Sequence, residues 1–450
     1  MADETSRRGF LTGLAGASLG LVLARKAQGA RRGSKEAAKY RPPEGFAAPP
    51  LDTVRMGFVG VGLQGGSHVK NFLQLEGVEI KAICDIDGPR AAEVGHWVAE
   101  AGRPAPDLYT RGEEDYKRLC ERSDIDLVFN ATPWRWHVPA CLEAMATGKH
   151  TAVEVPAALT VDDCWQLVET AERTRRHCVM MENCNYGRAE LMVLNMVRQG
   201  LFGELLHGEG AYIHDLRAIK FSDANEGLWR LEHSIKRNGN LYPTHGLGPI
   251  AQCMDINRGD QFDYMVSMSS NARGLALYAR ENLPETDSRR RGYALGDMNT
   301  SMIRTKLGRT IMVQHDTTTP RPYSRINLLQ GTRGCFSGYP DRVHIEGRTE
   351  GHGWEDGEAY REEFDHPLWR KLEADAEGAG HGGMDFLEDY RLIEALRAGE
   401  PTDMDVYDAA AISAVVEISE KSVAARSRAI EMPDFTRGRW QQNVPLEIVS

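Results

Sequence analysis

The chain contains 450 residues, of which 41% are hydrophobic, and its formal net charge at pH 7 is −11. This length and composition provide enough apolar surface for two packed domains and exclude a chain that is disordered throughout. The negative charge and the lack of a dense run of lysine and arginine argue against nucleic acid as a partner, because phosphate binding needs clustered positive charge. We therefore expect a small, neutral ligand.

The first residues resemble a twin-arginine export signal. Arg7 and Arg8 precede a weakly apolar run over residues 11–24, which is too short and too rich in glycine to cross a bilayer. We predict a signal peptide over residues 1–30, a linker over residues 31–51, and a periplasmic or secreted protein with no stable membrane span after removal of the signal. The alternative is an ordinary basic, apolar helix.

Short strand-like runs alternate with helical patterns in the next part of the chain. Strands linked by helices imply right-handed βαβ units and a parallel sheet. We therefore predict an α/β, Rossmann-like doubly wound domain over residues 52–175. The expected strands lie at residues 54–62, 78–87, 126–133 and 150–156, and one of the helical stretches lies at 89–102.

The character of the sequence changes after residue 175, where longer polar loops separate isolated strands and helices. We predict a second, α+β domain over residues 176–437 with a large open mixed sheet, followed by a tail over residues 438–450. A homo-oligomer formed through this sheet is one interpretation. The expected strands lie at residues 310–318 and 344–350, and the expected helices lie at 384–399 and 408–424.

A glycine loop after the first expected strand indicates a nucleotide site. Gly60, Gly62 and Gly65 have G-x-G-x-x-G spacing between a strand and a helix, so the backbone can approach a pyrophosphate at the helix N-terminus. Asp85 ends the second strand, where its carboxylate would bond the ribose hydroxyls and repel a 2′-phosphate. This predicts NAD rather than NADP, and the alternative is a glycine-rich turn without a ligand.

Later strand ends supply further candidates for the same crevice. Trp134 and His137 are candidate lips of the nicotinamide pocket, although Trp136 is equally well explained as core packing. The amide of Asn183 would hold the carboxamide or a ribose hydroxyl. The remaining candidates are Arg135, beside the two tryptophans, and Glu154 and Val155, which would close the crevice.

The second domain contains an unusual run, Tyr242-Pro243-Thr244-His245, which brings a phenol and an imidazole to one place. Several aromatic hydroxyl groups with one histidine suit a neutral, hydroxyl-rich ligand, because rings stack on C–H faces while the polar groups handle protons. We therefore predict a carbohydrate site, to which Tyr212, Arg230 and Tyr323 also contribute. Each tyrosine taken alone is more simply a half-buried packing residue.

The eight cysteines are scattered and include no C-x-x-C pair and no spacing typical of a metal site. Buried free thiols behave as small hydrophobic residues. We therefore expect free cysteines and no metal ion.

Taken together, seven motifs resemble those of glycoside hydrolase family 109, within the glucose-fructose oxidoreductase superfamily. The motifs are GVGLQG, CDID, TPWRWH, EVPAALT, MMENCNYGR, NGNLYPTHGLGPIAQ and HGGMDF, and the resemblance covers about residues 54–440. It implies an NAD-dependent N-acetylhexosaminidase, notably one that acts on terminal α-N-acetylgalactosamine. For NAD it implies Leu63, Gln64, Asp85, residues 134–137, Glu154, Val155 and Asn183; for the sugar it implies Tyr212, Arg230, Tyr242, His245 and Tyr323.

The same resemblance implies an unusual mechanism. NAD takes hydride from C3 of the sugar, the group at C1 leaves after loss of the C2 proton, water adds, and the hydride returns. We assign proton transfer to His245 and Tyr242. Val155 stands where related sugar dehydrogenases usually have a lysine, which argues against the second interpretation, a periplasmic NAD(P)-dependent sugar oxidoreductase with net hydride transfer. A third interpretation is a non-catalytic exported protein that binds NAD and sugar.

Overall fold

The structure is a computed structural model that describes residues 48–446. The predicted signal peptide and most of the predicted linker lie outside these residues, so export stays a prediction. No helix within residues 48–446 is long and apolar enough to cross a membrane.

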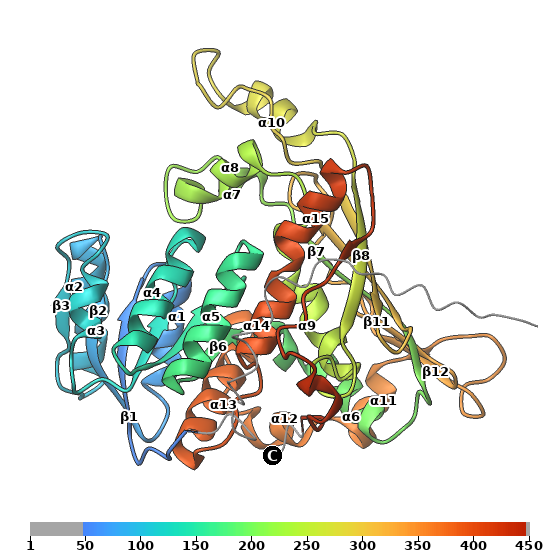
Figure 1. The fold of residues 1–450 in the computed structure, drawn as a ribbon, viewed down its shortest axis with the longest axis horizontal. Coiled ribbons are helices and arrows are strands. Elements are labelled where there is room, and N and C mark those ends of the chain that lie inside the picture. The colour runs from blue at the N-terminus through green and yellow to red at the C-terminus, as the bar shows by residue number, and fades with distance from the viewer. Residues whose placement is uncertain (1–47, 447–450) are drawn as a thin grey trace, which may run out of the picture. The chain divides into compact units, whose positions relative to one another are not determined.

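Six parallel strands form the first sheet, in the order β3-β2-β1-β4-β5-β6 (Figure 1). The chain crosses from strand to strand through helices, as the alternating pattern predicted. The strands are β1 Val54–Val59, β2 Val78–Cys84, β3 Asp107–Tyr109, β4 Leu127–Asn130, β5 His150–Glu154 and β6 Cys178–Met181, and the helices are α1 Leu63–Phe72, α2 Gly88–Glu100, α3 Tyr116–Cys120, α4 His137–Ala146 and α5 Val161–Thr174.

The first sheet extends beyond the predicted boundary at residue 175, because β6 pairs with β5. Two helices from late in the chain also belong to its packing: α13 (Met384–Ala398) lies against α1, and α14 (Val406–Ser413) lies against α5 and β6. Figure 1 shows these orange and red helices beside the blue and green helices of the first sheet. A parallel sheet is buried on both faces, and here the C-terminal part of the chain completes the cover.

Nine strands form the second, mixed sheet, in which β7 and β10 pair in parallel and the other pairs are antiparallel. The order is β14-β13-β12-β11-β7-β10-β9-β8-β15. The strands are β7 Leu205–Ile213, β8 Phe262–Ser269, β9 Asn299–Thr305, β10 Thr310–Asp316, β11 Leu328–Gly331, β12 Gly334–Ser337, β13 Arg342–Ile345, β14 Glu355–Asp356 and β15 Ile430–Glu431.

Helix α9 (Thr244–Cys253) packs against β7 of this sheet, and helix α15 (Val415–Ala424) packs against β8. Tyr264 and Met268 on β8 are exposed, and association of two copies through the sheet stays a prediction. The remaining helices are α6 Arg188–Arg198, α7 Arg217–Lys220, α8 Gly227–Lys236, α10 Gly274–Asn282, α11 Glu358–Phe364 and α12 Pro367–Leu372.

Two expected elements differ from the structure. The strand expected over residues 344–350 ends at Ile345, because the chain turns at Gly347, whose φ is +77°. The expectation is wrong beyond that residue. The helix expected over residues 408–424 is divided at Ala414 into α14 and α15. All eight cysteines are free, and only Cys335 is not fully buried.

A pair of buried histidines, His150 and His177, lies where strands β5 and β6 of the first sheet begin. The backbone N–H of His177 donates to Nδ1 of His150 over 3.0 Å, so this ring nitrogen must be unprotonated. Burial and the neighbouring His177 lower the pKa of His150 to about 3. The unfolded chain takes up this proton near pH 6.5, so acid favours unfolding.

We predict that His150→Gln makes stability less dependent on pH. Between pH 6.5 and 4 the wild-type protein should lose about 1.4 kcal/mol of unfolding free energy per pH unit through this histidine, because only its unfolded state is protonated. Above pH 6.5 the contribution is constant. Urea unfolding at several pH values measures the slope; His96→Gln, at an exposed position on α2, should keep it, and equal slopes in both variants would contradict the prediction.

Candidate active site

The glycine loop between β1 and α1 is shaped by two close contacts and one open position. Gly60 has φ +83°, a conformation that favours glycine. A Cβ atom on Gly65 would lie 2.1 Å from the carbonyl oxygen of Gly60, whereas a Cβ on Gly62 would meet no atom within 4 Å. The first and third glycines therefore allow close packing, and the second leaves space above the loop.

Groups around this space suit a dinucleotide. No side chain caps the N-terminus of α1, whose backbone N–H groups favour phosphate. The Asp85 carboxylate accepts hydrogen bonds from the backbone N–H groups of Val61 at 2.8 Å and Asp87 at 2.9 Å, which hold it beside the loop. Leu63 and Ile86 are large apolar side chains that are 70% and 67% exposed. A bound dinucleotide would find phosphate donors, a carboxylate and apolar surface here.

The four residues from Trp134 to His137 take different positions. Trp134 is buried and donates from Nε1 to the carbonyl of Val155 at 3.2 Å. Both ring nitrogens of His137 lie 2.8 Å from backbone carbonyl oxygens, of Thr132 and Pro156, so this imidazole joins the loop after β4 to the loop after β5. Trp136 packs edge-on to Tyr116, and Arg135 is exposed and pairs with Glu113. Contact of the four with NAD stays a prediction.

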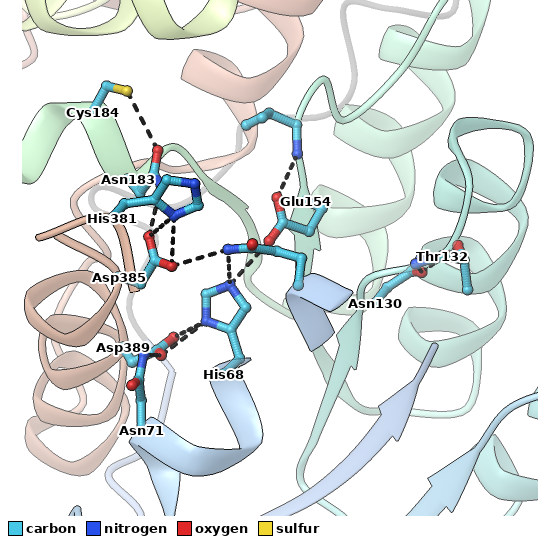
Figure 2. Close-up of polar contacts among 12 residues, drawn as sticks. His68, Asn71, Asn130, Thr132, Glu154, Asn183, Cys184, His381, Asp385 and Asp389 are labelled. Atoms are coloured by element: carbon cyan, nitrogen blue, oxygen red, sulfur yellow. Dashed lines mark hydrogen bonds and ion pairs between the residues drawn. The ribbon is translucent and has the colours of Figure 1, made fainter. Parts of the chain in front are cut away.

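Asp385, at the start of α13, joins two of the predicted cofactor residues (Figure 2). Its buried carboxylate accepts hydrogen bonds from Asn183 Nδ2 at 2.7 Å and Gln64 Nε2 at 3.1 Å, and His381 Nδ1 lies 2.9 Å away. Burial would raise the pKa of this carboxyl, but His381 and other partners outweigh it and lower the pKa to about 2. Asp385 is therefore ionised and accepts from all three.

Glu154, the third predicted cofactor residue near Asp385, belongs to the same network. Glu154 Oε1 lies 2.9 Å from Nε2 of the buried His68, and the Asp389 carboxylate lies 2.8 Å from Nδ1 of that ring. Burial opposes the charge of His68, but the two carboxylates outweigh it and raise the pKa of His68 well above its usual value. The His68 imidazolium thus ties Glu154 to α13.

Two glycines set the distance between α9 and β7. A Cβ on Gly210 would lie 2.0 Å from the carbonyl oxygen of Gly246, and a Cβ on Gly246 would lie 2.2 Å from the backbone nitrogen of Ala211. The helix therefore rests directly on the strand. This contact places the first residues of α9 beside the side chains at the end of β7.

Tyr212, Tyr242 and His245 form one aromatic cluster at this place. The Tyr212 and Tyr242 rings have centroids 4.4 Å apart, and the His245 ring lies 5.3 Å and 4.8 Å from them at steep angles. Burial raises the pKa of both phenols, so they stay neutral. Pro243 and Thr244 are buried at the start of α9 and hold Tyr242 and His245 on either side.

Arg230 and Tyr323 border the cluster. The Arg230 guanidinium lies 5.3 Å from the centroids of the Tyr242 and Trp134 rings and pairs with Glu226 at 2.8 Å. Tyr323 lies 6.4 Å from Tyr212 and is 41% exposed. Trp134, which was predicted for the cofactor, thus also contacts residues predicted for the sugar.

Glu182, at the end of the first sheet, was missed by the sequence analysis. It is fully buried, and its Oε1 lies 2.7 Å from Nδ1 of His245. Burial would raise the pKa of this carboxyl, but His245 and other hydrogen bonds outweigh it and lower the pKa. An ionised Glu182 accepts a hydrogen bond from Nδ1–H of His245 and so leaves Nε2 as the ring nitrogen with a free lone pair.

Cys184 lies close to the same pair, and the ligand atoms of Glu182, Cys184 and His245 are within 4.8 Å of one another. A metal would need the thiolate. Burial raises the pKa of the Cys184 thiol well above its usual value, and the thiol donates to Asn183 Oδ1. The hydrogen bond between Glu182 and His245 therefore accounts for the arrangement better than a metal ion does.

Two parts of the sequence match known families. Residues 186–442 match the profile "Glycosyl hydrolase 109, C-terminal domain", and residues 54–182 match "Oxidoreductase family, NAD-binding Rossmann fold". The first domain is therefore an NAD-binding Rossmann domain. The open position at Gly62, the uncapped helix and Asp85 fit this cofactor.

Similar proteins extend over almost the whole chain. One from Shewanella pealeana is 56% identical over 411 residues, which cover 90% of each chain, and one from Shewanella baltica is 53% identical over 453 residues, which cover 98% of each; both are named "Glycosyl hydrolase family 109 protein".

Solved structures with a similar fold are more distant in sequence. Levoglucosan dehydrogenase in complex with NADH and L-sorbose has a TM-score of 0.66 at 20% identity and covers 85% of this chain and 100% of its own. Aldose-aldose oxidoreductase from Caulobacter crescentus has a TM-score of 0.61 at 15% identity and covers 84% and 100%. This likeness concerns the fold.

We predict that Asp385→Asn lowers the amount of NAD that purifies with the protein several-fold. Asn183 donates to one carboxylate oxygen of Asp385 and Gln64 to the other. An amide keeps only one oxygen and so leaves one of these two side chains without its acceptor, at a cost of about 1–3 kcal/mol in stability. Nucleotide released on denaturation, per mole of protein, measures the effect.

The matched control for this prediction is Asp403→Asn. Asp403 is also buried and accepts from Tyr186 at 2.9 Å and from Arg391, but it has no hydrogen bond to a predicted cofactor residue. This variant should lose stability and keep its NAD. Equal NAD content in the two variants would show that Asp385 has no special part in holding the cofactor.

Proposed function

The chain belongs to glycosyl hydrolase family 109, and from this membership we propose that it hydrolyses terminal α-N-acetylgalactosaminides with bound NAD as a resident cofactor. The observation that carries the proposal is the His245–Glu182 pair, which lies against two neutral phenols beside the Rossmann domain. Gln64, Asp85, Glu154 and Asn183 would hold the cofactor. When bound, NAD supplies reversible hydride transfer at C3 of the sugar, which makes the C2 proton acidic.

His245 is the proposed base for the C2 proton. Because Glu182 occupies its Nδ1, the imidazole presents Nε2 as the proton acceptor, and the ring cannot rotate without losing a hydrogen bond to a buried carboxylate. The same histidine returns a proton to C2 after water has added to C1. The arrangement is that of a base oriented by a carboxylate.

Tyr242 is the proposed proton donor to the oxygen that leaves C1, and it regains its proton from the water that then adds to C1. Burial raises its pKa well above the usual value, so the phenol carries its proton at neutral pH. The nearby Arg230 guanidinium stabilises negative charge that develops on this oxygen or on the sugar. Tyr212 and Tyr323 then position the sugar ring.

Val155 supports the elimination over net oxidation. Its side chain is buried, its carbonyl accepts from Trp134, and its position has no titratable group. Proton transfer at the sugar therefore falls to the Tyr242–His245 cluster. A hydrolase of this kind consumes no NAD, because the hydride returns to the sugar, and it therefore needs no other oxidant to regenerate the cofactor.

Incubating the purified protein with a nitrophenyl α-N-acetylgalactosaminide, without added NAD, tests the proposal. We expect dye release without net accumulation of reduced cofactor at 340 nm. Reduced cofactor that accumulates in proportion to the sugar consumed would instead establish a net oxidoreductase. The absence of reaction with any N-acetylhexosaminide would indicate a protein that binds NAD and sugar without catalysis.

We predict that Glu182→Gln lowers kcat about 10²–10⁴-fold, because the amide no longer selects the Nδ1-protonated form of His245. NAD should stay bound in this variant. Glu182→Asp keeps the charge and should recover part of the rate. The pH profile of kcat should shift in Glu182→Gln, which lacks the carboxylate, and should not shift in Glu182→Asp. An unchanged profile in Glu182→Gln would remove Glu182 from the mechanism.

A further inference from the structure

A cavity of about 410 Å³ lies beside the second sheet, away from the glycine loop. Its lining comes from the start of α6, the turn after β12, strand β13 and the segment that leads into α11. The residues that matter for its chemistry are Arg188, Asp341, Arg342, Trp354 and Arg361. Its volume is in the range of small-molecule sites.

Trp354 gives the cavity an aromatic wall. The side chain is 45% exposed, and the Arg342 guanidinium lies 5.2 Å from the ring centroid. An exposed tryptophan in a cavity is a large apolar surface, and a flat ligand that covers the ring gains stability by removing that surface from water. The C–H face of a sugar ring is such a ligand.

Asp341 and Arg342 supply unused polar groups. No other residue among 48–446 donates a hydrogen bond to the half-buried Asp341 carboxylate, and burial raises its pKa. The guanidinium of Arg342 makes one long hydrogen bond, to Ser337 Oγ at 3.4 Å. A carboxylate and a guanidinium side by side match the donor and acceptor roles of sugar hydroxyl groups.

The charge of the cavity selects against an ionic ligand. Arg188 is already paired with Asp365 at 2.6 Å, and Arg361 with Glu358 at 2.7 Å. Glu355 accepts hydrogen bonds from Thr349 and Tyr360. The groups that remain in the lining are the Arg342 guanidinium and the carboxylates of Asp341 and Asp356, which have opposite charges. An acidic ligand would therefore be repelled by the carboxylates and a basic ligand by the guanidinium, whereas a neutral polyol can bond to both kinds of group.

A row of aromatic residues connects this cavity to the aromatic cluster at His245. Tyr323 lies 6.4 Å from Tyr212 and 6.1 Å from Tyr339, and the Arg325 guanidinium lies 5.8 Å and 5.6 Å from the Tyr323 and Tyr339 rings. Tyr339, which is 41% exposed, directly precedes Pro340 and Asp341 in the cavity wall. A chain of sugar residues can therefore extend from one site to the other.

We propose that the Trp354 cavity binds neutral sugar residues of the aglycone, that is, of the part of the glycan that leaves from C1 when the bond is cleaved. This inference rests on the proposed hydrolase activity, whose terminal sugar would occupy the His245 cluster. The cavity would then make the enzyme prefer an oligosaccharide to a simple aryl glycoside.

Paired substrates test this proposal. Trp354→Ala should lower kcat/KM about tenfold for a neutral oligosaccharide that ends in α-N-acetylgalactosamine and leave kcat/KM for the nitrophenyl monosaccharide unchanged. Asp341→Asn should act in the same direction. Tyr264→Ala, another exposed aromatic residue, on β8, should change neither substrate. An equal effect of Trp354→Ala on both substrates, or no effect on either, would overturn the proposal.

A binding measurement separates this proposal from the proposed function. Saturation-transfer NMR with the neutral oligosaccharide that lacks the terminal hexosamine needs no turnover. Signal in the wild-type protein that is lost in Trp354→Ala supports the cavity even if the enzyme proves inactive on every hexosaminide. No signal in the wild-type protein would overturn the proposal even if the hydrolase activity is found.

Discussion

The site depends on the direct contact between helix α9 and strand β7. Gly210 and Gly246 bring the two backbones so close that a methyl group on either would overlap main-chain atoms. Only at this distance can Tyr242 and His245, at the start of the helix, meet Tyr212, at the end of the strand. A larger residue would displace the helix and separate three rings at once, so these two glycines hold the aromatic cluster together.

Burial and hydrogen-bond partners together fix the protonation states of two phenols and two carboxylates of the site. Burial keeps the phenols of Tyr212 and Tyr242 protonated, and it would neutralise Glu182 and Asp385 as well if their partners did not compensate. The two carboxylates thus serve different regions: Glu182 binds the imidazole of His245, and Asp385 binds the side chains of Asn183 and Gln64, which are predicted to border the cofactor. The low dielectric that makes unpaired charges costly also makes these paired ones effective.

Local signals in the sequence predicted the first sheet and its glycine loop, because a turn, a strand and a helix N-terminus involve neighbouring residues. The run from Tyr242 to His245 was found for the same reason. Glu182 and Asp385 were missed because their roles come from residues far away in the sequence: Asp385 lies 202 positions from Asn183 and 321 from Gln64. Glu182 directly precedes Asn183, but nothing in that motif indicates that α9 returns to it. The first sheet extends past the predicted boundary at residue 175 because β6 and the late helices join it only through tertiary contacts.

The return of α13 to the glycine loop has a consequence for synthesis. A ribosome makes the chain from the N-terminus, and domains made early usually fold first. Here Asp385 binds the side chains of Gln64 and Asn183, and Asp389 holds Glu154 through His68. A nascent chain that ends before this segment therefore lacks the partners of three residues predicted to hold the cofactor. We therefore expect tight capture of the cofactor to follow translation of most of the protein.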